Sequence, residues 1–177
     1  MRVISGFISI VESRAHIMRR FVAYGEPDNP FSYSQSLLSN GLKPFESKIK
    51  AHESVIELFD FERADARKIH VAYLRLVIAE TKDDLKEFSN SRRLIVIGVD
   101  HALPGYSQYD LYGSARSPKE RDLPLTGASL SATGFRTFKA FNDAMMFWQE
   151  YTRQVQSPAM IAHMTLHRIE SHARPFE

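Results

Sequence analysis

Three histidines stand close together near the C-terminus, in the segment Ala-His-Met-Thr-Leu-His-Arg-Ile-Glu-Ser-His at 162–172. The threonine and isoleucine in it, and the Ser-Pro pair that precedes it, predict a strand rather than a helix. On a strand, His163, Thr165 and His167 share one face. His163 and His167 are then roughly 13 Å apart, which is too far for both to bind one metal ion. The pattern predicts a polar row that faces solvent or a cleft, and no metal site.

The sequence His163-Met164-Thr165, flanked by apolar residues, resembles one half of the signature of the 2H phosphoesterases. That family has two His-x-Ser/Thr motifs on paired strands, and the two histidines act as base and acid on a phosphodiester. The only other match in this chain is His52-Glu53-Ser54, in a segment whose sequence predicts a helix. The resemblance implies a phosphodiester-acting enzyme that uses His163 and Thr165, with His167 next on the same face.

Asp100-His101 follows the apolar run at 94–99, which is predicted to be a buried strand. Because loops at the carboxyl ends of strands line the cleft in many α/β enzymes, His101 is a further candidate catalytic residue. No strand is followed by a glycine-rich phosphate loop, and no Gly-x-Ser-x-Gly elbow occurs. We therefore expect no P-loop nucleotide hydrolysis and no cofactor.

A long stretch at 100–124 is rich in proline, glycine and charged residues, and we expect it to form a surface loop. Tyrosines recur at every third position in its first half, and basic residues follow them. A tyrosine ring with its polar hydroxyl can stack on a base or contact a protein partner. It can also pack against the domain and hold the loop in place. The candidate binding residues are Tyr106, Tyr109, Tyr112, Arg116, Lys119 and Arg121.

Length and composition indicate a folded chain of 177 residues, which we interpret as one domain over 1–177. The 23 basic residues are nearly balanced by 21 acidic ones, so no large positive field is expected. The absence of cysteine excludes disulfides, zinc sites with cysteine ligands and thiol nucleophiles. No apolar stretch approaches the roughly 20 residues that span a bilayer, so the default expectation is a cytoplasmic protein.

Hydrophobic periodicity predicts alternating strands and helices. The segment at 69–80 fits both strand and helix, and we favour strand because a new helix starts at Thr81. The expected strands are 3–11, 70–79, 93–99, 125–131 and 160–169, and the expected helices are 13–25, 46–59, 81–90 and 135–154. This order predicts an α+β fold, a mostly antiparallel sheet with helices packed on one face, of which the ferredoxin-like arrangement is one form.

The sequence therefore favours a small intracellular binding or regulatory protein. We expect it to engage a macromolecule, RNA or protein, through the open face of its sheet and the loop at 100–124. A phosphodiester-acting enzyme is the alternative, and the sequence is compatible with a homodimer.

Overall fold

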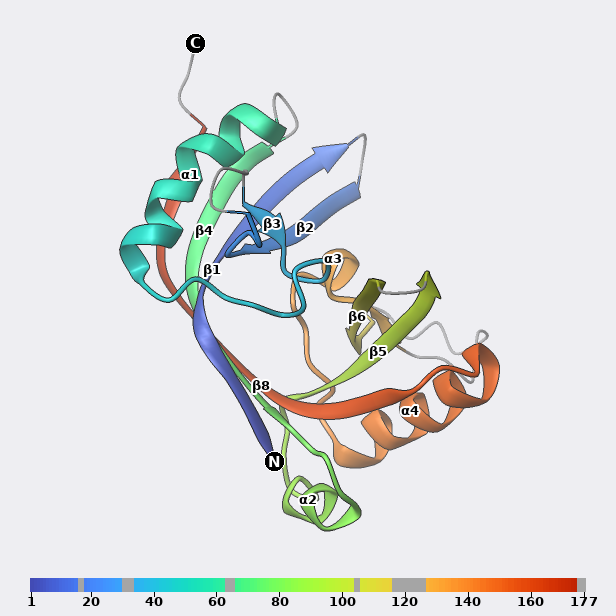
Figure 1. Cartoon of the computed structure of the whole chain (residues 1–177). Coiled ribbons are helices and arrows are strands. Elements are labelled where there is room, and N and C mark those ends of the chain that lie inside the picture. The colour runs from blue at the N-terminus through green and yellow to red at the C-terminus, as the bar shows by residue number, and fades with distance from the viewer. Residues whose placement is uncertain (16–17, 30–33, 63–65, 104–105, 116–126, 175–177) are drawn as a thin grey trace. The chain divides into compact units, whose positions relative to one another are not determined.

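The structure is a computed structural model of the chain (Figure 1). It describes residues 1–15, 18–29, 34–62, 66–103, 106–115 and 127–174. Two compact units are present, which we call the first unit (Ile4–Arg75 with Leu166–Glu177) and the second unit (Met1–Val3 with Leu76–Thr165). Three long strands contribute residues to both units, and these are β1 (Arg2–Ala15), β4 (Ala66–Ile78) and β8 (Ala159–Ala173).

The first unit is a sheet with a helix packed on it. Between β1 and β4 its elements are β2 (Met18–Gly25), β3 (Gln35–Ser36) and α1 (Lys48–Glu62). The strand order is β3-β2-β1-β4, and β2 pairs antiparallel with both of its neighbours. Helix α1 lies along β4 (Figure 1) because Ala51, Val55 and Leu58 form an apolar stripe that packs against Ile69 and Val71.

The second unit has the same plan. Its elements before β8 are α2 (Lys82–Glu87), β5 (Leu94–Leu103), β6 (Tyr106–Ser114), β7 (Gly127–Ser129), α3 (Leu130–Thr133) and α4 (Phe141–Val155). The strand order is β8-β5-β6-β7, and these pairs are antiparallel. Helix α4 buries Ala144, Phe147 and Tyr151 against Val96 and Ile161.

A turn with an unusual backbone recurs in both units, between the short third strand and the long helix. In the first unit Gly41 and Leu42 have φ angles of 74° and 60°, and in the second unit Gly134 and Phe135 have φ angles of 69° and 68°. Two successive left-handed residues are rare, and only glycine adopts this conformation without steric cost. The two units therefore repeat one local structure, which the pattern Gly-x-Lys/Arg-x-Phe at 41–45 and 134–138 encodes.

The phenylalanine that ends this pattern fixes the turn to the first long strand of its unit. Phe45 exchanges two backbone hydrogen bonds with Phe7, of 2.7 and 2.9 Å, and Phe138 exchanges two with Leu94, of 2.7 and 3.3 Å. Both phenylalanine rings are buried. Backbone pairing and a buried ring together hold each turn rigidly on its sheet.

Both faces of the sheet are covered over part of β1 and part of β5. Every residue is buried over 8–11 in β1 and over 94–99 in β5. Because successive residues of a strand point to opposite faces, burial of consecutive residues means that neither face is open there. The open sheet face expected from the sequence is thus not found on these parts of β1 and β5, whereas His167 and Arg168 in the middle of β8 are exposed.

The predicted α+β class with a mostly antiparallel sheet is confirmed, whereas the ferredoxin-like form is not. The predicted strands at 3–11, 70–79, 93–99 and 160–169 correspond to β1, β4, β5 and β8. The helices predicted at 46–59 and 81–90 correspond to α1 and α2.

Three predictions were wrong, each because tertiary pairing overrides local pattern. Residues 18–25 form β2 instead of a helix, since they pair with residues 9–15 of β1. Much of the predicted loop at 100–124 is a hairpin, because β5 continues to Leu103 and β6 runs from Tyr106 to Ser114. Helix α4 starts at Phe141 instead of 135, because the left-handed turn and the bridge at Phe138 come before it.

The strand predicted at 125–131 is shorter in the structure, where β7 spans Gly127–Ser129 and the helical turn α3 follows. Among the described residues, no helix is both long and apolar enough to cross a membrane.

Candidate functional site

Strand β8 carries the predicted catalytic residues His163, Thr165 and His167. The segment is extended throughout, which confirms that these side chains project from a strand. His163 and Thr165 are half-buried and His167 is exposed. The ring of His163 lies 6.4 Å from the ring of Phe88. A catalytic role for these residues stays a prediction.

The second His-x-Ser motif lies on helix α1, where the 2H phosphoesterases have a strand. Its serine, Ser54, is buried and donates to the carbonyl of Ala51 at 2.6 Å, and its hydroxyl lies 2.9 Å from that of Ser9. Ser54 therefore links α1 to β1. The paired-strand geometry of that family is not met by this motif.

The candidate binding residues from the predicted loop fall into different surroundings. Tyr109 is half-buried on β6. Tyr112 packs into the core of the second unit, with its ring 5.2 Å from Phe147 and 5.3 Å from Tyr151. The backbones of His101 and Tyr106 belong to β5 and β6, and their side chains lie outside the described residues. The basic residues Arg116, Lys119 and Arg121 also lie outside them.

The second unit carries a groove lined by basic side chains, which we call the basic groove. It consists of two adjoining hollows of about 630 and 320 Å³ that share Arg92 and Lys139. Arg93 and Arg136 also line it, and among the described residues neither hollow has an aspartate or glutamate in its wall. The remaining wall consists of polar residues, two phenylalanines and two alanines, and it is formed by Ser89, Asn90, Ser91, Ser114, Ala115, Phe135, Thr137, Ala140, Phe141 and Asn142.

Backbone pairing brings the two basic segments of this groove together. Arg93 directly precedes Leu94, whose bridge to Phe138 places the turn at 89–93 beside the segment at 135–142. The carbonyl of Arg93 also accepts a hydrogen bond of 2.8 Å from the amide of Met164. The backbone around these cations is therefore fixed by the bridge between Leu94 and Phe138 and by the hydrogen bond from Met164.

The four cations of the basic groove are exposed. Across the described part of the chain, none of them has a carboxylate within ion-pair distance. Other cations of the same unit are paired, as Lys86 is with Asp83 at 3.0 Å and Arg153 is with Glu150. The groove thus presents positive charge that the described residues leave uncompensated.

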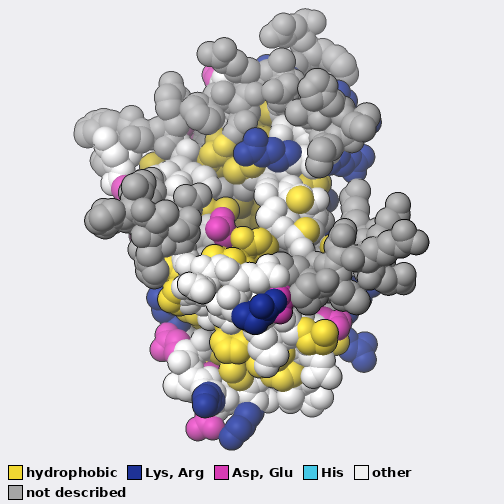
Figure 2. All heavy atoms as spheres, turned by 90° about the vertical axis from the view of Figure 1, so that its right-hand side faces the viewer, with side chains coloured by type: hydrophobic (Ala, Val, Ile, Leu, Met, Phe, Trp, Pro, Cys, Tyr) yellow, Lys and Arg dark blue, Asp and Glu magenta, His cyan; other side chains and the backbone are white. Residues whose placement is uncertain are grey.

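On the face shown in Figure 2, the basic, acidic and hydrophobic side chains drawn in colour are interspersed. Charge on that face is mixed, in agreement with a net charge of only +2. Attraction of an anion to this chain must then depend on a local arrangement of cations rather than on a general field.

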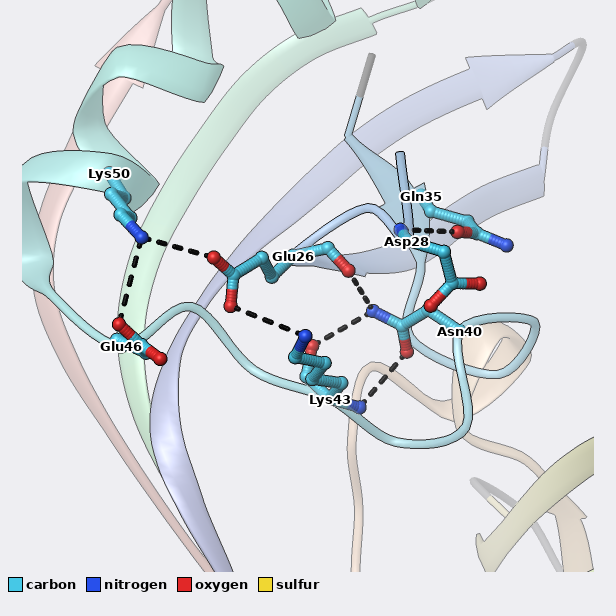
Figure 3. A network of polar contacts seen from close by, with 7 residues as sticks. All are labelled: Glu26, Asp28, Gln35, Asn40, Lys43, Glu46 and Lys50. Carbon is cyan, nitrogen blue, oxygen red and sulfur yellow. Dashed lines mark hydrogen bonds and ion pairs between the residues drawn. The ribbon is translucent and has the colours of Figure 1, made fainter. Parts of the chain in front are cut away.

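The corresponding place in the first unit is a closed network of opposite charges (Figure 3). Glu26 lies 3.1 Å from Lys50 and 3.8 Å from Lys43, and Lys50 lies 3.6 Å from Glu46. The hydrogen bond from Lys50 to Glu26, together with the charges of Glu26 and Glu46, raises the pKa of Lys50. Asn40 completes the network with hydrogen bonds to the carbonyls of Glu26 and Lys43. Charge is compensated here, so this place is a structural link rather than an anion site.

Two further clusters, both in the first unit, involve histidines of α1, β4 and β8. In the first cluster, His52 of α1 approaches Glu170 and His172 of β8. His52 Nδ1 lies 2.7 Å from Glu170 Oε1, and His172 Nε2 lies 3.5 Å from the same oxygen. The pKa of Glu170 is lowered, chiefly by the hydrogen bond from His52. These residues form a compact group of two imidazoles and one carboxylate.

The second histidine cluster is centred on His70, which is buried. Its Nδ1 lies 2.6 Å from the hydroxyl of Ser171, and its Nε2 lies 3.1 Å from a carboxylate oxygen of Glu12. With the proton on Nε2, the ring donates to Glu12 and accepts from Ser171. Both ring nitrogens are therefore satisfied, and the residue links β1, β4 and β8.

Sequence reasoning missed both the basic groove and the histidine group on α1 and β8. The pattern Gly-x-Lys/Arg-x-Phe could have identified the turn that carries Arg136. It could not have shown that no carboxylate of the described residues lies near this side chain. Pairing of His52 with Glu170 joins residues far apart in the chain and leaves no local signal. Comparison with models of known families, with curated proteins and with solved structures found no match.

Proposed function

We propose that this chain is an RNA-binding protein that holds the phosphate backbone of an RNA strand in the basic groove. The observation that carries the proposal is that four exposed cations line one groove whose described wall contains no carboxylate. Uncompensated cations in a groove repel one another, and a bound polyanion relieves this repulsion.

The chemistry of the groove suits phosphates. Arg92, Arg93 and Arg136 carry guanidinium groups, which can bind phosphate oxygens through two parallel hydrogen bonds. Hydroxyl and amide side chains in the same wall are further donors to phosphate and sugar. Phe135 and Phe141 are half-buried in the wall, where an exposed part of a ring can stack on a base.

Charge reversal in the groove tests the proposal. We would titrate a fluorescein-labelled single-stranded RNA with the full chain and follow its fluorescence anisotropy. The variant Arg92→Glu with Arg136→Glu should weaken binding at least about tenfold, because it removes two phosphate contacts and adds two negative charges that repel the phosphates. The matched control is Lys86→Glu with Arg153→Glu, which makes the same change in net charge in the same unit at cations outside the groove.

The control variant should bind RNA within about threefold of the unmodified chain at moderate salt. Equal losses in the two double variants would mean that binding follows net charge and not the groove, and would refute the proposal. Failure of the unmodified chain to bind RNA even at low salt would do the same, and would favour a protein partner instead. A single-stranded DNA of the same sequence shows whether the sugar contributes to recognition.

A further inference from the structure

The group formed by His52, Glu170 and His172 has the composition of a metal site. The ligand atoms that the three side chains offer all lie within 4.8 Å of one another. His52 comes from helix α1, whereas Glu170 and His172 are alternate residues of β8 and so share one face of that strand. Tertiary packing within the first unit thus assembles the group from two elements.

The surroundings of the His172 ring nitrogen Nε2 also point to a bound ion. Its Nε2 is shielded from solvent and has no hydrogen-bond partner among the described residues, although it lies 3.5 Å from Glu170 Oε1. A buried ring nitrogen without a partner costs free energy, and such an atom needs an explanation. The ring of His172 also lies 5.1 Å from that of His52 in an edge-to-face arrangement. Both imidazoles are therefore directed at the same carboxylate.

We propose that His52, Glu170 and His172 bind a divalent zinc ion. Zinc bound by imidazole nitrogen and carboxylate oxygen has bond lengths of about 2.0–2.2 Å, which in tetrahedral geometry puts ligand atoms roughly 3.3–3.5 Å apart. The distance of 3.5 Å between His172 Nε2 and Glu170 Oε1 matches this value. The ion replaces the proton in the 2.7 Å hydrogen bond between His52 and Glu170, and small side-chain movements accommodate it.

Ligand type and exposure define the class of ion and its coordination. Two imidazoles select zinc and similar transition metals over magnesium and calcium, which prefer oxygen ligands alone. Three protein ligands leave a fourth position for water or an external anion. The side chain of His52 is 54% exposed, so an ion can reach the group from solvent. This site lies in the first unit and does not depend on the proposed RNA-binding function.

Calorimetric titration of the full chain with zinc chloride, without a polyhistidine tag, tests the proposal. We expect one zinc ion per chain and no binding of magnesium chloride. The variants His52→Ala and His172→Ala should each weaken zinc binding at least about tenfold. The matched control is His167→Ala, which removes an exposed imidazole from the same strand and should leave zinc binding within about twofold.

Glu170→Gln provides a second test should an alanine variant fail to fold, because the amide keeps the size of the side chain and removes its charge. It should also weaken zinc binding at least about tenfold. The proposal is overturned if the unmodified chain shows no saturable binding of zinc. It is overturned as well if His167→Ala loses as much affinity as His172→Ala, or if magnesium binds as strongly as zinc.

Discussion

Arg136 in the second unit occupies the position that Lys43 occupies in the first unit. Each follows the two left-handed residues of the repeated turn, and the backbone carbonyl of each lies against a glycine at the end of a strand, Gly113 or Gly25. The residue after that glycine differs. Glu26 follows Gly25 and neutralises Lys43, whereas Ser114 follows Gly113, and no carboxylate of the described residues lies within ion-pair distance of Arg136. One backbone therefore supports a closed ionic network in one unit and a basic groove in the other.

This relationship predicts the effect of Ser114→Glu. A carboxylate at this position should neutralise Arg136 as Glu26 neutralises Lys43, and RNA affinity should fall about three- to tenfold. Anisotropy titration measures the change. The control Ser157→Glu adds the same charge to the same unit at a half-buried serine that does not line the groove. Similar losses for both variants would show that Ser114 has no special relation to Arg136.

Two glycines of the repeated structure should respond differently to alanine. A Cβ at Gly113 collides with the carbonyl of Arg136, which belongs to the backbone and cannot move away cheaply. A Cβ at Gly41 meets no atom within 4 Å, so only the φ of 74° is unfavourable. Gly41→Ala should therefore lower the free energy of unfolding by about 1–2 kcal/mol, and Gly113→Ala by more. Urea denaturation measures both values, and the reverse order would contradict the close approach at Gly113.

His70→Ala should destabilise the first unit by about 2–3 kcal/mol, because Glu12 and Ser171 then lose their buried partner and a cavity forms. His167→Ala, on the exposed side of β8, should change the free energy of unfolding by no more than about 0.5 kcal/mol. Chemical denaturation of the two variants gives the comparison. Equal stabilities would mean that the network around His70 has no structural role.

The capping box of α2 predicts a dependence of stability on pH. Backbone hydrogen bonds from Glu80 and Thr81 hold the pKa of Asp84 below its ordinary value of 3.8. A lowered pKa in the folded state means that the stabilisation is complete above pH 3.8 and is lost as the pH falls through the folded-state value. Asp84→Asn should thus be less stable than the unmodified chain at pH 7.

The difference between Asp84→Asn and the unmodified chain should shrink as the pH is lowered from 5 to about 2.5. Urea denaturation at several pH values follows it. The companion variant Thr81→Ala removes the other half of the capping box and should cost about 1 kcal/mol. A gap for Asp84→Asn that does not change with pH would show that the carboxylate charge is not what stabilises the cap.

His163→Ala separates the binding proposal from the enzymatic alternative that the sequence raised. His163 lies on β8 and does not line the basic groove, so RNA affinity should stay within about twofold of the unmodified chain. A phosphodiester-acting enzyme would instead bind RNA and cleave it, and this variant would abolish cleavage. Gel analysis of the RNA after incubation distinguishes the two outcomes.

The sequence was sufficient for the fold class and for most of the long elements. Periodicity identified α1 and β5. The strand β4 was recognised from the helix start at Thr81, and β8 from its threonine and isoleucine and the Ser-Pro pair before it. Periodicity failed at 18–25, where the spacing of Met18, Phe21 and Val22 resembles that of a helix. Only the pairing of this segment with β1 makes it a strand. Non-local pairing of this kind leaves no signal in a window of sequence.

Prediction of the site was weaker, for the same physical reason. The tyrosines at 106–112 suggested a binding loop, yet the pairing of β5 with β6 makes a hairpin and packs Tyr112 inward. The basic groove depends on a bridge between Leu94 and Phe138, which joins two segments that are distant in the chain. Only the tertiary structure shows that Arg92 and Lys139 line the same groove.

Photocrosslinking to an RNA that contains 4-thiouridine, with mapping of the adducts by mass spectrometry, tests most directly where RNA binds. Adducts are expected in the segments at 89–93 and 135–142, which line the basic groove. They should disappear in the variant Arg92→Glu with Arg136→Glu and persist in Lys86→Glu with Arg153→Glu. Adducts confined to the first unit, or adducts that survive the charge reversal in the groove, would contradict the account.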